Sequence, residues 1–122
     1  LEVSQHALLA RDGTLVVGVP CVQQVERGRF LSVRAAHARE LDAMEARALE
    51  DTLEQLASAL HDLGYFGPFG VDAYRYRDVA GNARWNPCGE LNARYTMGFA
   101  VGMAGRSFQP SPTRSRSVRS VA

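Results

Sequence analysis

The stretch from about Ala38 to Leu63 limits the possible folds of this chain more than any other. Its apolar residues recur at steps of three and four, and they are Leu41, Met44, Ala48, Leu49, Leu53, Leu56, Leu60 and Leu63. This spacing places them along one side of an α-helix. Gly64 follows the last of them, as is typical of a helix C-terminus. The sequence therefore predicts one long amphipathic helix, whose apolar side must be covered by other parts of the chain.

Strand-like segments stand on both sides of this helix. They are residues 2–10, 14–25, 30–33, 69–77 and 84–95. Asp12-Gly13 separates the first two segments and Gly81-Asn82 separates the last two, and both dipeptides are signals for tight turns. We therefore predict an α+β fold, in which an antiparallel β-sheet carries the long helix packed on it.

The length and charge of the chain fit one small domain. The chain has 122 residues and a net charge of +1, which by itself implies neither nucleic acid nor an acidic partner. No apolar run approaches the roughly 20 residues of a membrane span, and no signal peptide is visible. Cys21 and Cys88 form no metal-type pair and suggest no disulfide scaffold. We therefore expect a cytoplasmic protein that makes no membrane contact.

The two ends of the chain have different characters. Leu1 enters directly into strand-like alternation without a methionine, which fits a chain cut from a longer protein. Beyond Gly105, periodicity vanishes, serine and proline dominate, and the charged residues are Arg106, Arg114, Arg116 and Arg119. We expect a domain of residues 1–105 and a disordered basic tail of residues 106–122. Nucleic-acid binding by the tail is not favoured, because no aromatic stacking residue follows Phe108.

The stretch from Asp72 to Arg94 carries the residues with the clearest chemistry. Side chains of an extended segment alternate between its two faces. Glu90, Asn92 and Arg94 would then share one face, and Leu91, Ala93 and Tyr95 the other. We expect the apolar set to pack on the core, which leaves the polar set facing a cleft.

The turn indicates which residues of this hairpin stand opposite each other. A turn centred near Gly81 places Asp72 directly across from Glu90, with Cβ atoms about 5 Å apart. Two carboxylates at that distance repel each other unless a cation lies between them. Asn92 adds a neutral oxygen on the same face, and phosphate oxygens with water would complete an octahedral shell. The pattern predicts a site for Mg²⁺ or Mn²⁺, provided that the register does not slip by one residue.

A second interpretation needs no metal. Asp72 and Glu90 would then be carboxylates at the rim of the sheet, each paired with a nearby arginine. The candidates are Arg75, Arg77, Arg84 and Arg94. Structural ion pairs of this kind are common, so both interpretations stay open on the residues alone.

The run Gly70-Val71-Asp72-Ala73-Tyr74, followed after the turn by Glu90-Leu91-Asn92-Ala93-Arg94, resembles the end of an ATP-grasp domain. In that family an acidic residue on one strand and a Glu-x-Asn-x-Arg run on the next complete the Mg–ATP site. The order of elements is also similar, with two strands, a long helix and then the acidic hairpin. The resemblance covers residues 1 to about 104. Asn86-Pro87-Cys88 departs from the aliphatic run that is common before the glutamate.

The resemblance implies a role for several positions. Asp72, Glu90 and Asn92 match the metal ligands, and Arg94 matches the arginine that faces phosphate or substrate during catalysis. Tyr74 matches part of the floor of the adenine pocket, although a plain core aromatic is an equally good interpretation.

Two further positions lie farther from the hairpin in the sequence. Gln23 matches a polar position near the phosphates, although a surface strand residue explains it as well. Glu2 lies where the nucleotide-binding strand of the family begins, but the register of that segment does not assign it a role.

The activity implied by the resemblance is that of an ATP-dependent ligase. ATP-grasp enzymes typically activate a carboxylate as an acylphosphate, which an amine or another nucleophile then attacks. The implied ligands and partners are ATP, Mg²⁺, a small carboxylate substrate and the N-terminal ATP-grasp subdomain. No glycine-rich lid or lysine-bearing strand precedes the first strand, so we expect the chain alone to be inactive. The alternative is a degenerate, non-catalytic remnant that serves as an interaction or structural module.

Overall fold

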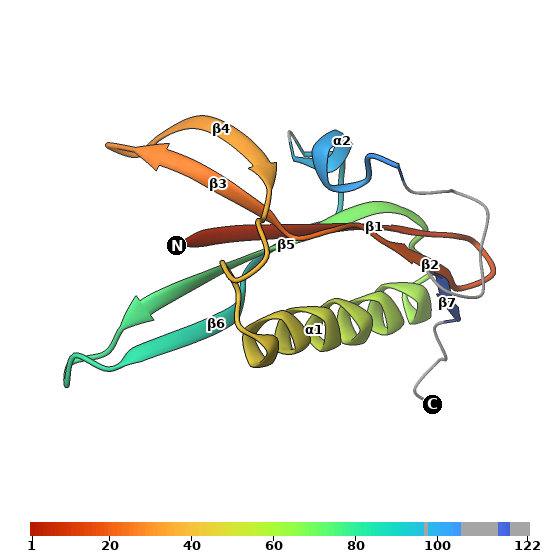
Figure 1. Cartoon of the computed structure of the whole chain (residues 1–122). Helices are drawn as coiled ribbons and strands as arrows, with labels where there is room; N and C mark the ends of the chain where they lie inside the picture. The colour runs from red at the N-terminus through yellow and green to blue at the C-terminus, as the bar shows by residue number, and fades with distance from the viewer. Residues whose placement is uncertain (97, 106–114, 118–122) are drawn as a thin grey trace.

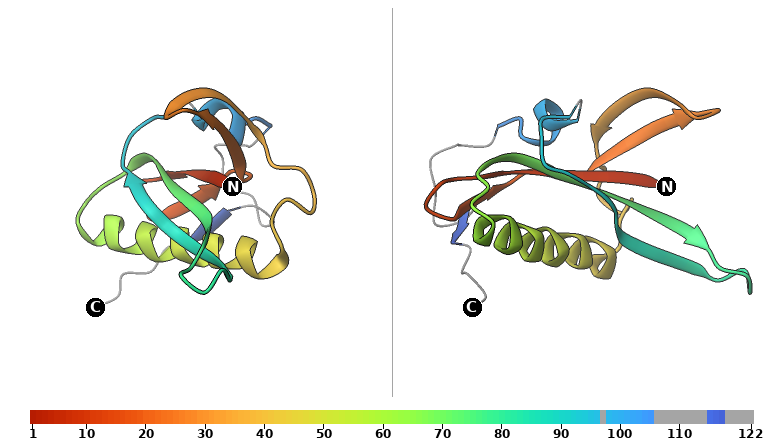
Figure 2. Two further views of the ribbon diagram at one scale, coloured as in Figure 1. Left: turned by 90° about the vertical axis from the view of Figure 1, so that its left-hand side faces the viewer. Right: turned by 180° about the vertical axis from the view of Figure 1, so that it is seen from behind.

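The computed structural model describes residues 1–96, 98–105 and 115–117. The strands are β1 (Glu2–Leu9), β2 (Thr14–Val17), β3 (Cys21–Glu26), β4 (Arg29–Ala35), β5 (Gly67–Arg77), β6 (Ala83–Asn92) and β7 (Ser115–Ser117), and the helices are α1 (Ala43–Asp62) and α2 (Phe99–Gly102). All strand pairs in this sheet are antiparallel. The long helix lies against one face of the sheet and the short helix lies on the other (Figures 1 and 2). The predicted α+β class is confirmed.

Strand β1 is the centre of the sheet. On one side it pairs with β5 along its whole length, and on the other side it pairs with β3 near Glu2 and with β2 near Leu9. The segment 14–25, predicted as one strand, is therefore two strands. Gly18, Val19 and Pro20 separate them, and proline has no N–H to donate to the ladder.

The hydrophobic core lies between the sheet and α1. Alternate residues of β1 and their cross-strand partners point toward the helix, and the buried set is Val3, Ala7, Leu9, Leu15, Val22, Phe69, Val71 and Ala73. From the helix, Leu49, Leu53 and Ala57 are fully buried against them. Burying a leucine side chain contributes roughly 1.5–3 kcal/mol, so this contact holds the two layers together. On β1, Ser4, His6 and Leu8 alternate with the core residues and point to the opposite face.

Helix α1 begins later than the apolar spacing predicts. Asp42 is its N-cap, and its carboxylate accepts a hydrogen bond from the Glu45 backbone N–H, while the Glu45 carboxylate accepts one from the Asp42 backbone N–H. This capping box fixes Ala43 as the first helical residue, so residues 38–42 precede the helix. The C-terminal prediction is confirmed, because the helix ends before Gly64, which has a φ of +82°.

Only part of the predicted basic tail belongs to the described residues. Ser115–Ser117 form β7, which pairs with β2, and the rest of the segment 106–122 lies outside the described part of the chain. None of the described helices combines the length and apolar character needed to cross a membrane.

Candidate functional site

The sheet face opposite α1 brings polar side chains from four strands together. Cross-strand partners share a face, and on this face Glu2 of β1 pairs with Gln23 of β3 and with Tyr74 of β5. Asp72 of β5 pairs in turn with Glu90 of β6. Helix α2 covers the same face farther along β1, near His6. The polar residues therefore form an open area beside a covered one.

The predicted register of the acidic hairpin is confirmed at the site. Asp72 stands directly opposite Glu90, and Gly70 stands opposite Asn92. Toward the turn the register differs, because Tyr74 pairs with Asn86 and a bulge lies between the two regions. In this bulge, residues 87–89 of β6 face a single residue of β5. The irregular Asn86-Pro87-Cys88 sequence is the reason, since proline cannot donate a ladder hydrogen bond.

Asp72 lies at the centre of a chain of amide and carboxylate contacts. Its Oδ1 accepts a hydrogen bond from Gln23 Nε2 at 3.3 Å, and its Oδ2 accepts one from Asn92 Nδ2 at 3.1 Å. Arg94 in turn donates to Asn92 Oδ1 at 3.3 Å. The structure thus brings together Gln23, Asp72, Asn92 and Arg94.

The surroundings of Asp72 disfavour its charged form. Burial raises the pKa of the Asp72 carboxyl, and the nearby Glu90 carboxylate raises it further. The hydrogen bonds from Asn92 and Gln23 oppose this rise, and Glu2 adds a smaller repulsion. A cation placed among these carboxylates would remove the repulsion.

The predicted pairing of Asp72 and Glu90 with arginines is wrong for the described residues. The arginines close to them in sequence have other partners: Arg75 binds Glu45, Arg77 donates to the Gly81 carbonyl oxygen, Arg84 binds Asp78, and Arg94 contacts Asn92 and the Tyr95 carbonyl oxygen. Glu90 and Glu2 are exposed and have no hydrogen bond or ion pair with any described residue. The acidic group is therefore not neutralised within the described part of the chain.

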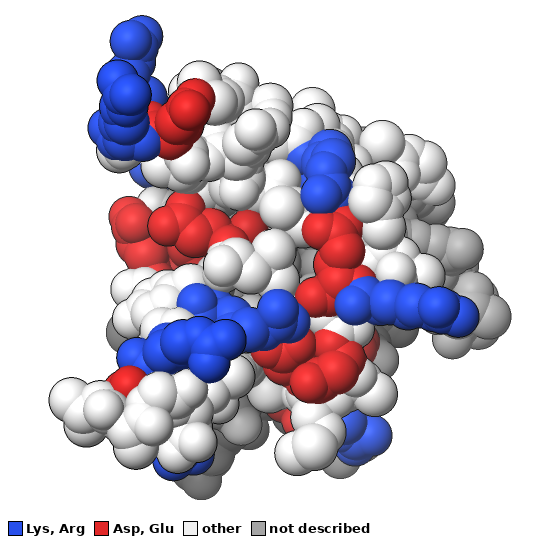
Figure 3. All heavy atoms as spheres, turned by 60° about the vertical axis from the view of Figure 1, so that its left-hand side comes forward, with Lys and Arg blue, Asp and Glu red and all other residues white. Residues whose placement is uncertain are grey.

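These carboxylates line a cavity of about 320 Å³. Its lining residues are Glu2, Val3, Gln23, Asp72, Ala73, Tyr74, Gly89 and Glu90. Seen from the side on which the N-terminus lies, acidic and basic side chains form separate groups rather than one field of a single sign (Figure 3). A ligand of this cavity would meet the carboxylates of Glu2, Asp72 and Glu90.

Tyr74 forms an aromatic wall of the same cavity. Its side chain is 39% exposed, and its hydroxyl accepts a hydrogen bond from Asn86 Nδ2 at 3.0 Å. The ring lies directly over Gly89, where an added Cβ would be 2.7 Å from Tyr74 Cε1. The predicted alternative, a plain core aromatic, does not describe this exposed ring.

The residues fit a divalent cation in chemical type. Carboxylate and amide oxygens are the ligands that Mg²⁺ prefers, and Asp72, Glu90 and Asn92 supply both kinds. Within the described residues, however, no three His, Cys, Asp or Glu side chains converge as a metal cluster. Asn92 also turns its amide nitrogen, not its oxygen, toward Asp72. Rotation of that amide by half a turn would exchange the two atoms.

The expected division of polar and apolar residues in β6 is wrong beyond Asn92. The strand ends there, so the alternation of strand side chains no longer determines which way the next residues point. Ala93, Arg94 and Tyr95 are all exposed. Tyr95 packs edge-on against Phe99 at a centroid distance of 4.8 Å and remains 65% exposed. Leu91 pairs with buried Val71, but it lies on an edge strand and is 37% exposed.

Sequence reasoning left Glu2 unassigned, whereas the structure places it in the cavity lining. Its position follows from the pairing of β1 with both β3 and β5, which joins segments far apart in the sequence. The alternation of Glu2, Ser4 and His6 along β1 is the signal that could have indicated it.

The chain resembles known proteins in structure but has no match in sequence. No protein-family model matches the chain, and no curated protein sequence does. Among solved structures, it is similar to carboxyaminoimidazole ribonucleotide synthase from Aspergillus clavatus in complex with ATP, at 15% sequence identity and a TM-score of 0.47. The match covers 80% of this chain and 23% of that protein, so the chain spans under a quarter of its length.

Proposed function

We propose that this chain is the metal- and nucleotide-binding half of an ATP-grasp ligase, which activates a carboxylate as an acylphosphate for attack by an amine or another nucleophile. One observation carries the proposal: Asp72 and Glu90 face each other on an open cavity, and neither has a cationic partner among the described residues. The sequence run Glu90-Leu91-Asn92-Ala93-Arg94 gives it independent support.

In this proposal Asp72, Glu90 and Asn92 hold the metal. One or two Mg²⁺ ions, when bound, would neutralise charge on the ATP phosphates. Asp72 has a fixed position, because Gln23 and Asn92 hold its two oxygens. Glu90 is exposed and can turn toward the phosphates. Burial and Glu90 raise the pKa of Asp72, which means that they disfavour its charged form. A bound cation would favour that form again.

The remaining residues would position the nucleotide and the substrate. The exposed ring of Tyr74 offers a flat apolar surface for the adenine base. Gln23 fixes the Asp72 carboxylate and lines the cavity that the phosphates would enter. Arg94 would stabilise the substrate carboxylate or the acylphosphate, because its guanidinium lies beside Asn92 and is exposed.

Half of such a site cannot complete the reaction. The lid and lysines that hold the nucleotide from the other side would belong to a partner subdomain, so we expect the 122-residue chain alone to have negligible ligase activity. ATP hydrolysis with candidate carboxylates and amines, measured on this chain and on a longer parent, checks this. Substantial turnover by the chain alone would contradict it.

Metal binding tests the site directly. We expect Mn²⁺, followed by electron paramagnetic resonance with and without ATP, to bind the chain, and we expect Asp72→Asn and Glu90→Gln each to weaken binding at least about tenfold. Glu26→Gln, at an exposed strand glutamate outside the cavity, is the matched control. Equal affinities for Glu90→Gln and Glu26→Gln would remove the basis of the proposal.

One observation favours the alternative of a non-catalytic remnant. Both oxygens of Asp72 already accept hydrogen bonds from side-chain amides, so its position does not depend on a metal. A remnant of this kind would fold normally and bind no Mn²⁺. The same titration separates the two functions, because only the ligase half requires Mn²⁺ binding that depends on Asp72.

A further inference from the structure

A second cavity lies on the opposite face of the β5–β6 hairpin. Its volume is about 490 Å³, and it is lined by the first turns of α1, by the residues before them and by both strands of the hairpin. Arg75 and Trp85 form a cross-strand pair on this side, whereas Tyr74 and Asn86 point to the acidic side. The two cavities are therefore back to back, and the proposed ligase reaction does not use the second one.

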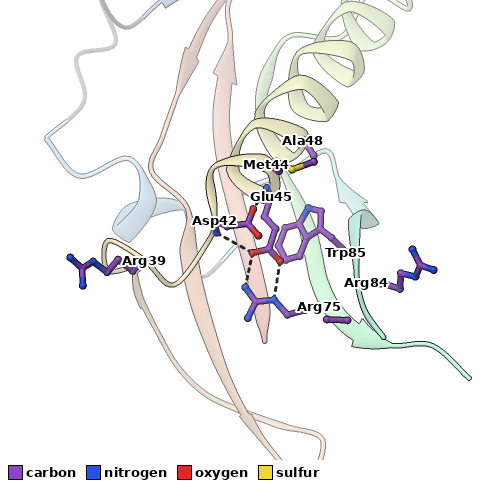
Figure 4. A pocket seen from close by; sticks show the side chains of 9 residues that line it. Arg39, Asp42, Met44, Glu45, Ala48, Arg75, Arg84 and Trp85 are labelled. Atoms are coloured by element: carbon purple, nitrogen blue, oxygen red, sulfur yellow. Dashed lines mark hydrogen bonds and ion pairs between the residues drawn. The ribbon is translucent and has the colours of Figure 1, made fainter. Parts of the chain in front are cut away.

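The walls of this cavity are mainly apolar. Trp85 of β6 lies across from Met44 and Ala48 of α1 (Figure 4), and Ala83 extends the same surface. Small-molecule sites in proteins typically have volumes of about 300–1,000 Å³, apolar walls and a few polar groups. The flat indole of Trp85 makes an aromatic ring the best-fitting occupant.

One buried polar atom beside the cavity has no partner among the described residues. The indole nitrogen of Trp85 is buried and donates to no acceptor in the described residues. Figure 4 shows it on the edge of the ring nearest Met44 and Ala48. The nearby Met44 side chain is 84% exposed and is free to move when a ligand acceptor approaches this N–H.

Of the three arginines that line the cavity, two are paired within the described part of the chain. Glu45 is neutralised by two hydrogen bonds from Arg75, and the Asp42 carboxylate caps α1. Arg84 is paired with Asp78 at 2.9 Å. Arg39, in contrast, has no hydrogen bond or ion pair with a described residue, and its φ of +78° is rare for a side chain other than glycine. Figure 4 shows Arg39 apart from the other lining side chains, with its guanidinium pointing away from Trp85.

We propose that this cavity binds a small aromatic molecule that carries an acidic group. The ring would lie against Trp85 between Met44 and Ala48, an acceptor would take the free indole N–H, and the acidic group would pair with Arg39. The flexible side chain of Arg39 can turn toward the opening. Because the hairpin carries Asp72 and Glu90 on its other face, a ligand here would lie directly behind the acidic cavity.

Trp85 makes the proposal directly measurable, because it is the only tryptophan of the chain. We would titrate the full chain with phenylacetate and follow the indole N–H resonance by nuclear magnetic resonance, with phenylacetamide as the neutral analogue and acetate as the analogue without a ring. A ligand of about ten non-hydrogen atoms is expected to bind with a dissociation constant near or below about 6 mM. We expect saturable shifts with phenylacetate, weaker ones with phenylacetamide and none with acetate.

Variants separate binding in the cavity from binding elsewhere. Ala48→Leu fills the cavity and should weaken phenylacetate binding at least about tenfold, whereas the same change at exposed Ala59 on α1 should leave it unchanged. Arg39→Gln should weaken it about two- to fivefold, and Arg47→Gln, outside the cavity, should not. Absence of a saturable shift overturns the proposal. So does equal binding by Ala48→Leu and Ala59→Leu, or by phenylacetate and phenylacetamide.

Discussion

The ion pair between Arg75 and Glu45 joins the acidic hairpin to the start of α1. Arg75 donates from Nε to Glu45 Oε2 at 2.8 Å and from a terminal nitrogen to Oε1 at 2.6 Å. It also donates to the Glu40 carbonyl oxygen at 3.1 Å. We predict that Arg75→Ala destabilises the chain more than Arg84→Ala does.

The size of the effect follows from the burial of the two partners. The Glu45 side chain is only 10% exposed, so removal of Arg75 leaves a nearly buried carboxylate with one hydrogen bond, from the Asp42 backbone N–H. Breaking a fully buried pair from one side costs about 3–5 kcal/mol. Arg75 itself is 37% exposed, and solvent weakens its contribution. We therefore expect a loss of about 2 kcal/mol in the free energy of unfolding.

Urea unfolding followed by circular dichroism measures this loss. Arg84→Ala is the matched control, because Arg84 is also paired with a carboxylate on this hairpin but is 58% exposed. Its loss should be clearly smaller. In a double-mutant cycle, Glu45→Gln should remove most of the effect of Arg75→Ala, since the two side chains act as a unit.

The same pair predicts a dependence on pH. The hydrogen bonds from Arg75 lower the pKa of Glu45 below 4.5, although burial opposes them. A lowered folded-state pKa means that the stabilisation is complete above the unfolded-state pKa and is lost as the pH falls through the folded-state value. The difference between wild type and Arg75→Ala should therefore shrink below pH 4.5. A loss no larger than that of Arg84→Ala, or a difference unchanged in acid, would refute the reasoning.

Three more predictions concern the polar face of the sheet. Asp72→Asn removes a charge that burial and Glu90 disfavour but leaves one of the two amide donors, on Gln23 and Asn92, without its oxygen acceptor, so the free energy of urea unfolding should change by less than about 1 kcal/mol while Mn²⁺ binding weakens at least about tenfold; a larger change in either direction would contradict this. Burial lowers the pKa of His6 from 6.5 to about 4, so stability that is complete above pH 6.5 should fall by up to about 3 kcal/mol as the pH drops to about 4. Urea unfolding across this range checks it, and constant stability would argue against a neutral buried His6. In Gly98→Ala the new Cβ would lie 2.7 Å from His6 Cε1, so α2 must shift, with an expected cost of about 1–3 kcal/mol and a changed His6 ring resonance.

Short-range patterns in the sequence predicted much of the fold. The apolar stripe ending at Leu63 located α1 and its C-terminus, because helical spacing and a glycine stop depend on neighbouring residues only. The turn near Gly81 placed Asp72 opposite Glu90, since a hairpin register is set by its turn. The start of the helix shows the limit of such patterns. Apolar spacing predicted a start near Ala38, but the capping pair Asp42 and Glu45 fixes it at Ala43.

Apart from Gln23, which the family resemblance indicated, the contacts within the candidate site were predictable only where the residues share one hairpin. Asp72 and Glu90 do, and their pairing was predicted. Gln23 reaches Asp72 across 49 positions of sequence, and Glu2 joins them only because β1 lies between β3 and β5. The burial of Asn92 likewise depends on what packs beside the end of β6.

The sequence by itself determined the helix, the turns and the opposed acids, because each depends on spacing within a short stretch of chain. The tertiary structure decided which face of each strand is covered, which arginines are already paired, and where the two cavities lie on the β5–β6 hairpin. These properties depend on contacts between segments far apart in the sequence, and the free energy of such contacts comes from burial and charge pairing that no local pattern records.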